Sequence, residues 1–225
     1  MYNAERFIGE ALESVRSQTV RPREIIVVDD GSTDRSVALV EAWDPEIRVL
    51  TQANAGAASA RQAGTALANG EMLAFLDADD LWLPDALEVR LAVLEAHPDV
   101  HAVYGGVQQF MCETAPEAVK QSMSIHTDIE PARHPGCMLI RTAAFRAMGG
   151  FNRDFREGEM LEFVSRFESA GFVSHMIPNL FFRRRVHGAN TVRNAKSLNK
   201  AYLAALRERL RQKRAGGVGV CGEAP

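Results

Sequence analysis

Two short apolar runs that each end in carboxylates constrain the fold of this chain more than any other feature. The first, Glu24–Val28, runs into Asp29 and Asp30, and the second, residues 71–76, runs into the acidic stretch 77–80. A helix-compatible segment follows each run, which is typical of a β-strand leading into a helix. In open α/β sheets ligands bind beyond the carboxyl ends of the strands, so both acidic clusters are predicted to face one pocket.

The second cluster places Asp77, Asp79 and Asp80 within four residues. Mg2+ and Mn2+ prefer oxygen ligands and bind through one or two carboxylates while bridging substrate phosphates, so the cluster is a candidate metal-diphosphate site. The alternative is a solvated acidic turn that caps the following helix. The coincidence with the first cluster, where Gly31 permits a tight turn, favours the ligand site.

Helical and extended segments alternate along the chain and predict an α/β fold, with a mostly parallel sheet flanked by helices on both faces. Strands are expected over residues 25–28, 47–50, 71–76, 100–105, 137–141, 172–177 and 180–186. Helices are expected from a cap at Asn3, over 34–43, 57–69 and 84–96, and over 142–148 and 158–170. Periodicity is weak between 106 and 135, where we expect either a loop that shapes a substrate pocket or an ordinary irregular connection.

Composition excludes several classes of protein. A chain of 225 residues with 46% hydrophobic content fits one domain with a substantial core. The net charge of −3 argues against general nucleic-acid binding. Cys112, Cys137 and Cys221 are widely spaced, which indicates neither a zinc site nor a disulfide framework. Reduced thiols, with no signal peptide or long apolar run, predict a cytoplasmic location.

Six short motifs occur in one order along the chain: Tyr2-Asn3, Ser17-Gln18-Thr19, Val28 to Asp34, Asn54-Ala55-Gly56 with Ala60-Arg61, Leu76 to Asp80, and Gly149-Gly150-Phe151-Asn152. Over residues 2 to about 190 this order resembles family 2 of the inverting glycosyltransferases, which have the GT-A fold. The resemblance implies one GT-A domain over 1–214, with a nucleotide-sugar-binding half (1–105), an acceptor and catalytic half (106–195) and a basic helix (196–214). Residues 215–225 are expected to form a disordered tail.

The resemblance also implies roles for individual residues. Asp30 would contact the nucleotide base, Arg61 the nucleotide, and Asp79 with Asp80 the ribose and a Mn2+ or Mg2+ ion. Further residues are assigned by their motifs to the nucleotide-sugar site: Tyr2, Asn3, Asp29, Asn54 and Asp77. The implied partner is a nucleotide-diphosphate sugar, and the acceptor, whether saccharide, lipid-linked or protein, is not specified.

A basic run near the end of the last predicted strand contains Arg184, Arg185 and His187. Guanidinium groups bind phosphate oxygens in bidentate fashion and imidazole is a common metal ligand, so these residues are candidates for the diphosphate and metal site. From the residues alone, an exposed basic turn is the stronger interpretation. The family resemblance supports His187 as a metal ligand.

Inverting transfer needs a carboxylate that removes the acceptor proton. Members of the family usually show Glu-Asp at the start of the late helix, whereas this chain has Glu159-Met160, with Glu162 one turn further on. Glu159 and Glu162 are therefore the candidate bases. Two other functions stay open: a non-catalytic nucleotide-sugar-binding protein, and a haloacid-dehalogenase-type phosphatase, because Phe75–Asp79 resembles that nucleophile motif.

The two ends of the chain add two expectations. The family normally has an apolar strand ending in Pro before Tyr-Asn, but Met1 directly precedes Tyr2, so we expect the first strand to be missing or encoded upstream. Residues 197–214 predict a basic amphipathic helix. Such a helix permits peripheral contact with an anionic membrane, although a packed terminal helix is the preferred interpretation.

Overall fold

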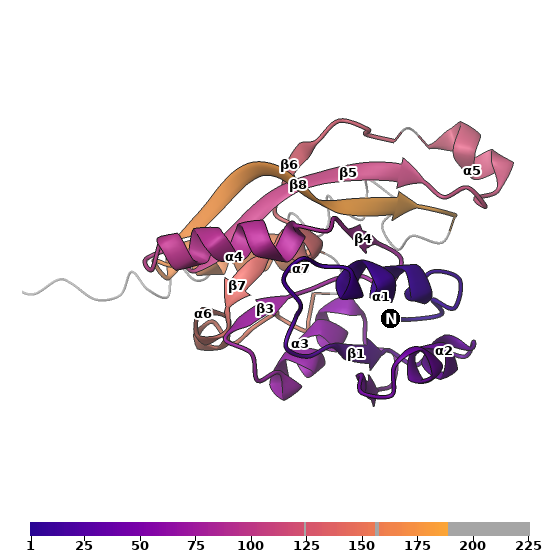
Figure 1. Ribbon diagram of the computed structural model, residues 1–225, viewed down its shortest axis with the longest axis horizontal. Helices are drawn as coiled ribbons and strands as arrows, with labels where there is room; N and C mark the ends of the chain where they lie inside the picture. The colour runs from indigo at the N-terminus through magenta and orange to yellow at the C-terminus, as the bar shows by residue number, and fades with distance from the viewer. Residues whose placement is uncertain (124, 156–157, 189–225) are drawn as a thin grey trace, which may run out of the picture.

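The computed structural model describes residues 1–123, 125–155 and 158–188, and Figure 1 shows them as helices packed around two sheets. The N-terminal part contains α1 (Ile8–Arg16), β1 (Ile26–Asp29), α2 (Ser36–Trp43), β2 (Arg48–Thr51), α3 (Ala57–Leu67) and β3 (Met72–Ala74). The following part contains β4 (Leu81–Trp82), α4 (Ala86–Ala96), β5 (Ala102–Met111), α5 (Glu117–Ser122) and β6 (Glu130–Ala132). A short 3-10 helix η1 (Pro135–Cys137) then leads to β7 (Leu139–Arg141), α6 (Thr142–Ala147), α7 (Glu159–Ser169) and β8 (Ser174–Val186).

The strands form a two-stranded sheet, β1-β2, and a larger sheet in the order β3-β7-β5-β8-β4, in which β6 also pairs with β5. The α/β class is confirmed, but the expectation of mostly parallel pairing is wrong for the larger sheet. Among the strand pairs of the described residues, only β1 with β2 and β5 with β8 are parallel, and the other four are antiparallel. Strands β6 and β7 do not pair with each other but pair antiparallel with successive parts of β5, β6 with Gly105–Val107 and β7 with Ala102–Val103.

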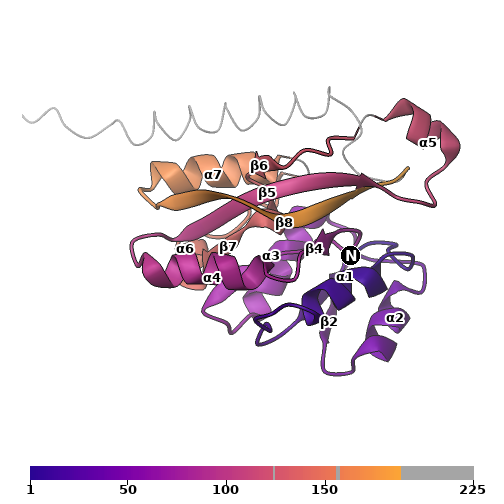
Figure 2. The same ribbon diagram turned by 45° about the horizontal axis from the view of Figure 1, so that its top comes forward.

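Helices cover both faces of the larger sheet. Figure 2 shows α7 on one side of β5 and β8 and α4 on the other. Along β5 the side chains alternate accordingly, because Ala102 and Tyr104 belong to the cluster around Phe163 of α7, whereas Val103 belongs to the cluster around Leu94 of α4. Burial on both faces explains why this strand is apolar without interruption at its start.

The weakly periodic stretch after residue 105 has more regular structure than the sequence predicts. Strand β5 continues to Met111 and pairs along its length with β8, which is a single strand where two were expected. The pairing register shifts next to Gly105 and Gly106. A Cβ on Gly105 would overlap the ring of Phe181, so glycine is required for this close approach.

At the N-terminal end, the β1 edge away from β2 is contacted by the backbone of Met1. The Met1 nitrogen donates to Val28 O (2.5 Å), and Asp30 N donates to Met1 O (2.8 Å). Within the described residues no further strand pairs with this edge.

Two expectations for the C-terminal end fall on residues 196–225, which lie outside the described residues. They are the basic helix with its membrane contact and the disordered tail. In the described part of the chain, none of the helices has the length and apolarity needed to span a membrane.

Candidate active site

The turn after β1 is held by its own carboxylates. Asp29 is 1% exposed and accepts from Ser32 N at 3.2–3.3 Å. Asp30 accepts at one oxygen from Gln52 Nε2 (2.7 Å) and Ala55 N (2.9 Å), and at the other from Gly56 N (2.8 Å). Both oxygens of Asp30 therefore hold the loop before α3, and a contact with a nucleotide base would have to share or replace these bonds.

Asn3 supports the same turn instead of capping α1. Its Oδ1 accepts from Thr33 N (2.9 Å), and its own backbone N–H donates to Ser32 Oγ (2.9 Å). The helix begins only at Ile8, so the expected cap is wrong. Tyr2, which precedes Asn3 and is 54% exposed, and Asn54, which is also exposed, are accessible to a ligand.

Arg61 of α3 joins the end of β3 to the start of α7. Its guanidinium donates to Asp77 Oδ1 at 2.6 Å and to Glu159 Oε1 at 2.7 Å, and its side chain is only 11% exposed. The structure thus brings together three residues predicted from separate motifs. Because both terminal nitrogens are used on protein carboxylates, Arg61 is a less direct nucleotide ligand than the resemblance implies.

The contacts within this group shift the pKa values of Arg61 and Asp77. Burial would lower the pKa of Arg61, but the adjacent Asp77 and Glu159 carboxylates outweigh it and raise the pKa. Burial would raise the pKa of Asp77, but the Arg61 charge holds that pKa at about 2. Asp77 therefore remains anionic at any pH at which the protein works.

Asp79 and Asp80 point to different neighbours although they are adjacent in sequence. Asp79 Oδ2 lies 2.9 Å from His187 Nε2, and the Asp79 side chain is 29% exposed. Asp80 is 3% exposed and its Oδ1 accepts from Arg185 N at 2.7 Å. Burial, together with the nearby charges of Asp79 and Asp77, raises the pKa of Asp80 well above its ordinary value. The solvent-accessible carboxylate of the pair is thus Asp79.

Arg185 braces this acidic turn. Its Nε donates to Asp79 O (2.9 Å) and its guanidinium also contacts Glu10 Oε2 of α1 (2.7 Å). The group lies over the rings of Phe7 and Phe110, at 5.0 and 4.7 Å from their centroids. The guanidinium is thereby used on protein groups, whereas Arg184, which is partly exposed, is the arginine of this run better placed for a ligand.

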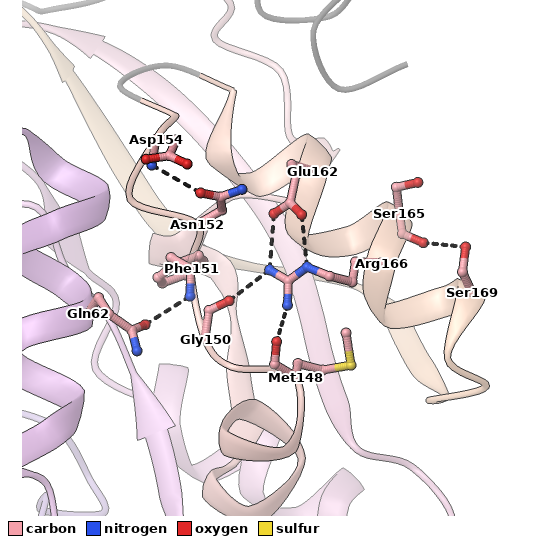
Figure 3. A network of polar contacts seen from close by, with 10 residues as sticks. All are labelled: Gln62, Met148, Gly150, Phe151, Asn152, Asp154, Glu162, Ser165, Arg166 and Ser169. Carbon is pink, nitrogen blue, oxygen red and sulfur yellow. Dashed lines mark hydrogen bonds and ion pairs between the residues drawn. The ribbon is translucent and has the colours of Figure 1, made fainter. Parts of the chain in front are cut away.

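Glu162 is bound to Arg166 and holds a turn (Figure 3). Its carboxylate accepts from Arg166 Nε (2.8 Å) and from a terminal nitrogen (3.0 Å), and Glu162 is 3% exposed. Arg166 also donates to the carbonyls of Met148 and Gly150, and Gln62 of α3 accepts from Phe151 N at 2.9 Å. The Gly149–Asn152 motif is therefore fixed between α3 and α7, and this geometry favours Glu159 over Glu162 as the base.

Met160, which stands where the family usually has Asp, points away from these groups. It is 8% exposed and packs in the cluster of Phe145 and Phe163. It cannot accept a proton, so the candidate base in this part of α7 is Glu159.

His134 is close enough to the candidate site to feel its charges, and the sequence analysis did not predict this. It lies within electrostatic reach of Asp77, Arg61, Arg184 and Asp79, and burial lowers its pKa to about 4. The only sequence signal was a polar side chain directly before Pro135-Gly136, in a stretch without periodicity.

A divalent cation fits the Asp79–His187 pair. In the described residues no three His, Cys, Asp or Glu side chains are grouped to hold a metal. Mg2+ and Mn2+, however, commonly use only one or two protein ligands and take the rest from substrate phosphates and water. A partly exposed carboxylate oxygen and an imidazole nitrogen 2.9 Å apart provide such a partial set.

Comparison with solved structures identifies the fold. Residues covering 92% of the chain superpose on Staphylococcus aureus TarS 1-349 in complex with UDP-GlcNAc, with a TM-score of 0.69, 18% identity and coverage of 64% of that chain. The mannosyltransferase PcManGT from Pyrobaculum calidifontis, in complex with GDP-Man and Mn2+, matches all of this chain and 64% of its own, with a TM-score of 0.62 and 21% identity. The fold is therefore that of the GT-A glycosyltransferases.

Sequence comparison gives the family. The profile described as Glycosyl transferase family 2 matches residues 1–153, and the chain belongs to this family. A provisionally named glycosyltransferase, EpsH of Bacillus subtilis (strain 168), is 30% identical over 198 residues, which are 83% of this chain and 54% of EpsH. The chain thus spans about half the length of that relative. Family membership confirms the resemblance seen in the motifs and displaces the phosphatase alternative.

Proposed function

We propose that this chain transfers a sugar from a nucleotide-diphosphate donor to an acceptor hydroxyl, with inversion at the anomeric carbon and with a divalent cation. The observation that carries the proposal is the Asp77–Arg61–Glu159 group. One buried guanidinium bonds both to Asp77, after the end of β3, and to Glu159, the favoured candidate base at the start of α7. The donor and the acceptor hydroxyl would meet between these two elements.

We assign a separate role to each group of residues. Asp79 and His187 would hold the cation, which when bound would neutralise charge on the departing diphosphate. Arg184 would contact phosphate oxygens, and Asp80 with Arg185 would keep the Asp79 turn in place. The Asp29–Ser32 turn, with Tyr2, Asn3 and Asn54 beside it, would receive the nucleoside. This assigns residues 1–105 mainly to the donor and 106–195 mainly to the acceptor.

Glu159 would accept the proton of the attacking hydroxyl. Its carboxylate is anchored through Oε1 by Arg61, which orients it, and Oε2 would be the proton acceptor. Attack from the face opposite the diphosphate would invert the configuration of the anomeric carbon.

The supporting comparisons concern other proteins. TarS was solved with UDP-GlcNAc and PcManGT with GDP-Man and Mn2+, so a nucleotide-sugar and a divalent cation are the first ligands to test. The protein should be incubated with UDP-Glc, UDP-GlcNAc or GDP-Man, with Mn2+, with Mg2+ or with EDTA, while release of the nucleoside diphosphate is measured. Nuclear magnetic resonance of the product would give its anomeric configuration. Retention of configuration, or full turnover in EDTA, would overturn the corresponding part of the proposal.

A second function is favoured by Met160. Because this buried side chain replaces the Asp usual in the family, binding of a nucleotide-sugar without transfer is the alternative. Calorimetric binding of a donor without any turnover on a broad acceptor panel would select it.

A further inference from the structure

His134 lies close to the acidic cluster but takes no part in the chemistry assigned above. It precedes η1, on the connection between β6 and β7, and is half-buried. Its electrostatic neighbours are Asp79 and Arg184, at the proposed diphosphate end of the site, and Asp77 and Arg61, of the group that anchors the base.

Two contacts hold the ring in place, and a third holds the turn beside it. It stacks on Phe182 with 4.9 Å between centroids and 22° between planes. Its Nδ1 accepts from Gly136 N at 3.1 Å, and Gly136 O in turn accepts from Trp82 Nε1 at 2.8 Å. A Cβ at Gly136 would overlap Phe182, so the tight approach of this turn requires glycine. Trp82 follows Asp80 by two residues, which connects His134 to the acidic turn through a short, buried path.

These contacts also define the tautomer. Because Nδ1 accepts a hydrogen bond, it carries no proton, and the proton of the neutral ring is on Nε2. Within the described part of the chain, Nε2–H donates to no protein group. The lowered pKa of about 4 agrees with a neutral ring under working conditions.

We propose that His134 Nε2–H donates a hydrogen bond to an oxygen of the sugar carried by the nucleotide donor, and so helps to determine which sugar is accepted. This inference rests on the proposed function, since it needs a nucleotide-sugar in the site. The sugar must span the distance from the diphosphate, near Asp79, to the base on α7, and His134 interacts electrostatically both with Asp79 and with Arg61, which anchors that base. An uncharged donor beside carboxylates suits a neutral hydroxyl or amide oxygen better than a phosphate.

The test compares a donor with the same nucleotide lacking its sugar. Calorimetry in the presence of Mn2+ would compare the affinity of the full chain for UDP with its affinity for UDP-GlcNAc, and the affinity for GDP with that for GDP-Man. His134→Asn keeps an acceptor near Gly136 N and removes the group at Nε2, whereas His134→Gln keeps a donor near Nε2. For the pair that the wild type binds, His134→Asn should weaken the nucleotide-sugar by about fivefold to tenfold and the sugar-free nucleotide by less than about twofold. His134→Gln should recover most of the loss.

A structural role would give a different result. If His134 had only a structural role, its substitutions would weaken the binding of the nucleotide and of the nucleotide-sugar to the same extent, or would lower thermal stability in parallel with binding. Either result overturns the inference. His134→Phe, which retains the stack on Phe182, provides a second variant and should show the same selective loss as His134→Asn. The inference is also overturned if His134→Asn and His134→Phe both bind the nucleotide-sugar with unchanged affinity. If the wild type binds none of the four ligands, the proposed function fails and this inference fails with it, whereas a binding wild type with unselective variants removes the inference alone.

Discussion

Replacement of Arg61 by methionine gives the sharpest test of how the site is held together. Methionine retains much of the buried length of the arginine side chain but removes both bonds to Asp77 and Glu159. Arg61 is 11% exposed, Glu159 14% and Asp77 33%. Removal of one partner from a buried ion pair costs about 3–5 kcal/mol, and the partial exposure of Asp77 reduces the expected loss in the free energy of unfolding to about 2–4 kcal/mol at pH 7.

The pH dependence of stability gives a second, independent value for the contribution of the Arg61–Asp77 pair to the free energy of unfolding. Arg61 lowers the pKa of Asp77 from its ordinary 3.8 to about 2, against the opposite effect of burial. At 1.36 kcal/mol per pKa unit this is an upper limit of about 2.4 kcal/mol, or about 1–2 kcal/mol after screening by solvent. Because the folded pKa is depressed, this stability is present above the unfolded value, near about 3.9, and is lost as the pH falls toward about 2.

Urea unfolding at pH 7, 5 and 3 would measure both effects. Between pH 5 and pH 3, the difference in the free energy of unfolding between the wild type and Arg61→Met should fall by about half of the Asp77 contribution. Arg35→Met, which removes an arginine that is 80% exposed and pairs with Glu5, is the control and should cost less than about 1 kcal/mol at each pH. A stability difference for Arg61→Met that is small, or equal at all three pH values, would refute the electrostatic account.

Three further predictions follow from the same geometry. Asp79→Ala or His187→Gln should weaken Mn2+-dependent binding of a nucleoside diphosphate by about tenfold or more, and unchanged metal-dependent affinity in calorimetry would remove them from the cation site. Glu159→Gln should lower turnover by about a hundredfold with donor affinity retained, whereas Glu162→Gln should mainly lower the free energy of unfolding, by about 1–3 kcal/mol. If steady-state kinetics showed that only Glu162→Gln lost turnover, the roles of the two residues would be reversed. Gly150→Ala should destabilise the protein by about 1–3 kcal/mol in urea unfolding, because residue 150 has φ of 71° and a Cβ would overlap Gln62, and an unaffected variant would contradict the rigid turn.

The sequence predicted the elements whose periodicity reflects burial. In α1, residues Ile8, Ala11, Leu12 and Val15 recur at helical spacing, and all four are buried. The acidic ends of β1 and β3 and the approach of His187 to Asp79 also follow from motifs in order. These features depend on local patterns, so one sequence contains enough information to find them.

Other features depend on contacts between distant segments. Nothing local indicates that Arg61 would use both ends of its guanidinium on Asp77 and Glu159, or that Arg166 would bind Glu162 and the turn at Gly150. The strand pairing of β5 with β8 past residue 105 is set by Phe181 filling the space that glycine leaves. His134 was missed for the same reason, because its place in the site is fixed by Phe182 and Trp82 and not by its neighbours in sequence.

The indole bond between Trp82 Nε1 and Gly136 O gives the protein an internal optical probe. The chain has two tryptophans, and Trp82 is 8% exposed with its ring 5.3 Å from the Arg90 guanidinium carbon. With Trp43 replaced by phenylalanine, the remaining emission would arise from one buried indole that touches the turn carrying His134. A shift of its spectrum would then report occupation of the site in real time, without a label and without any knowledge of the acceptor.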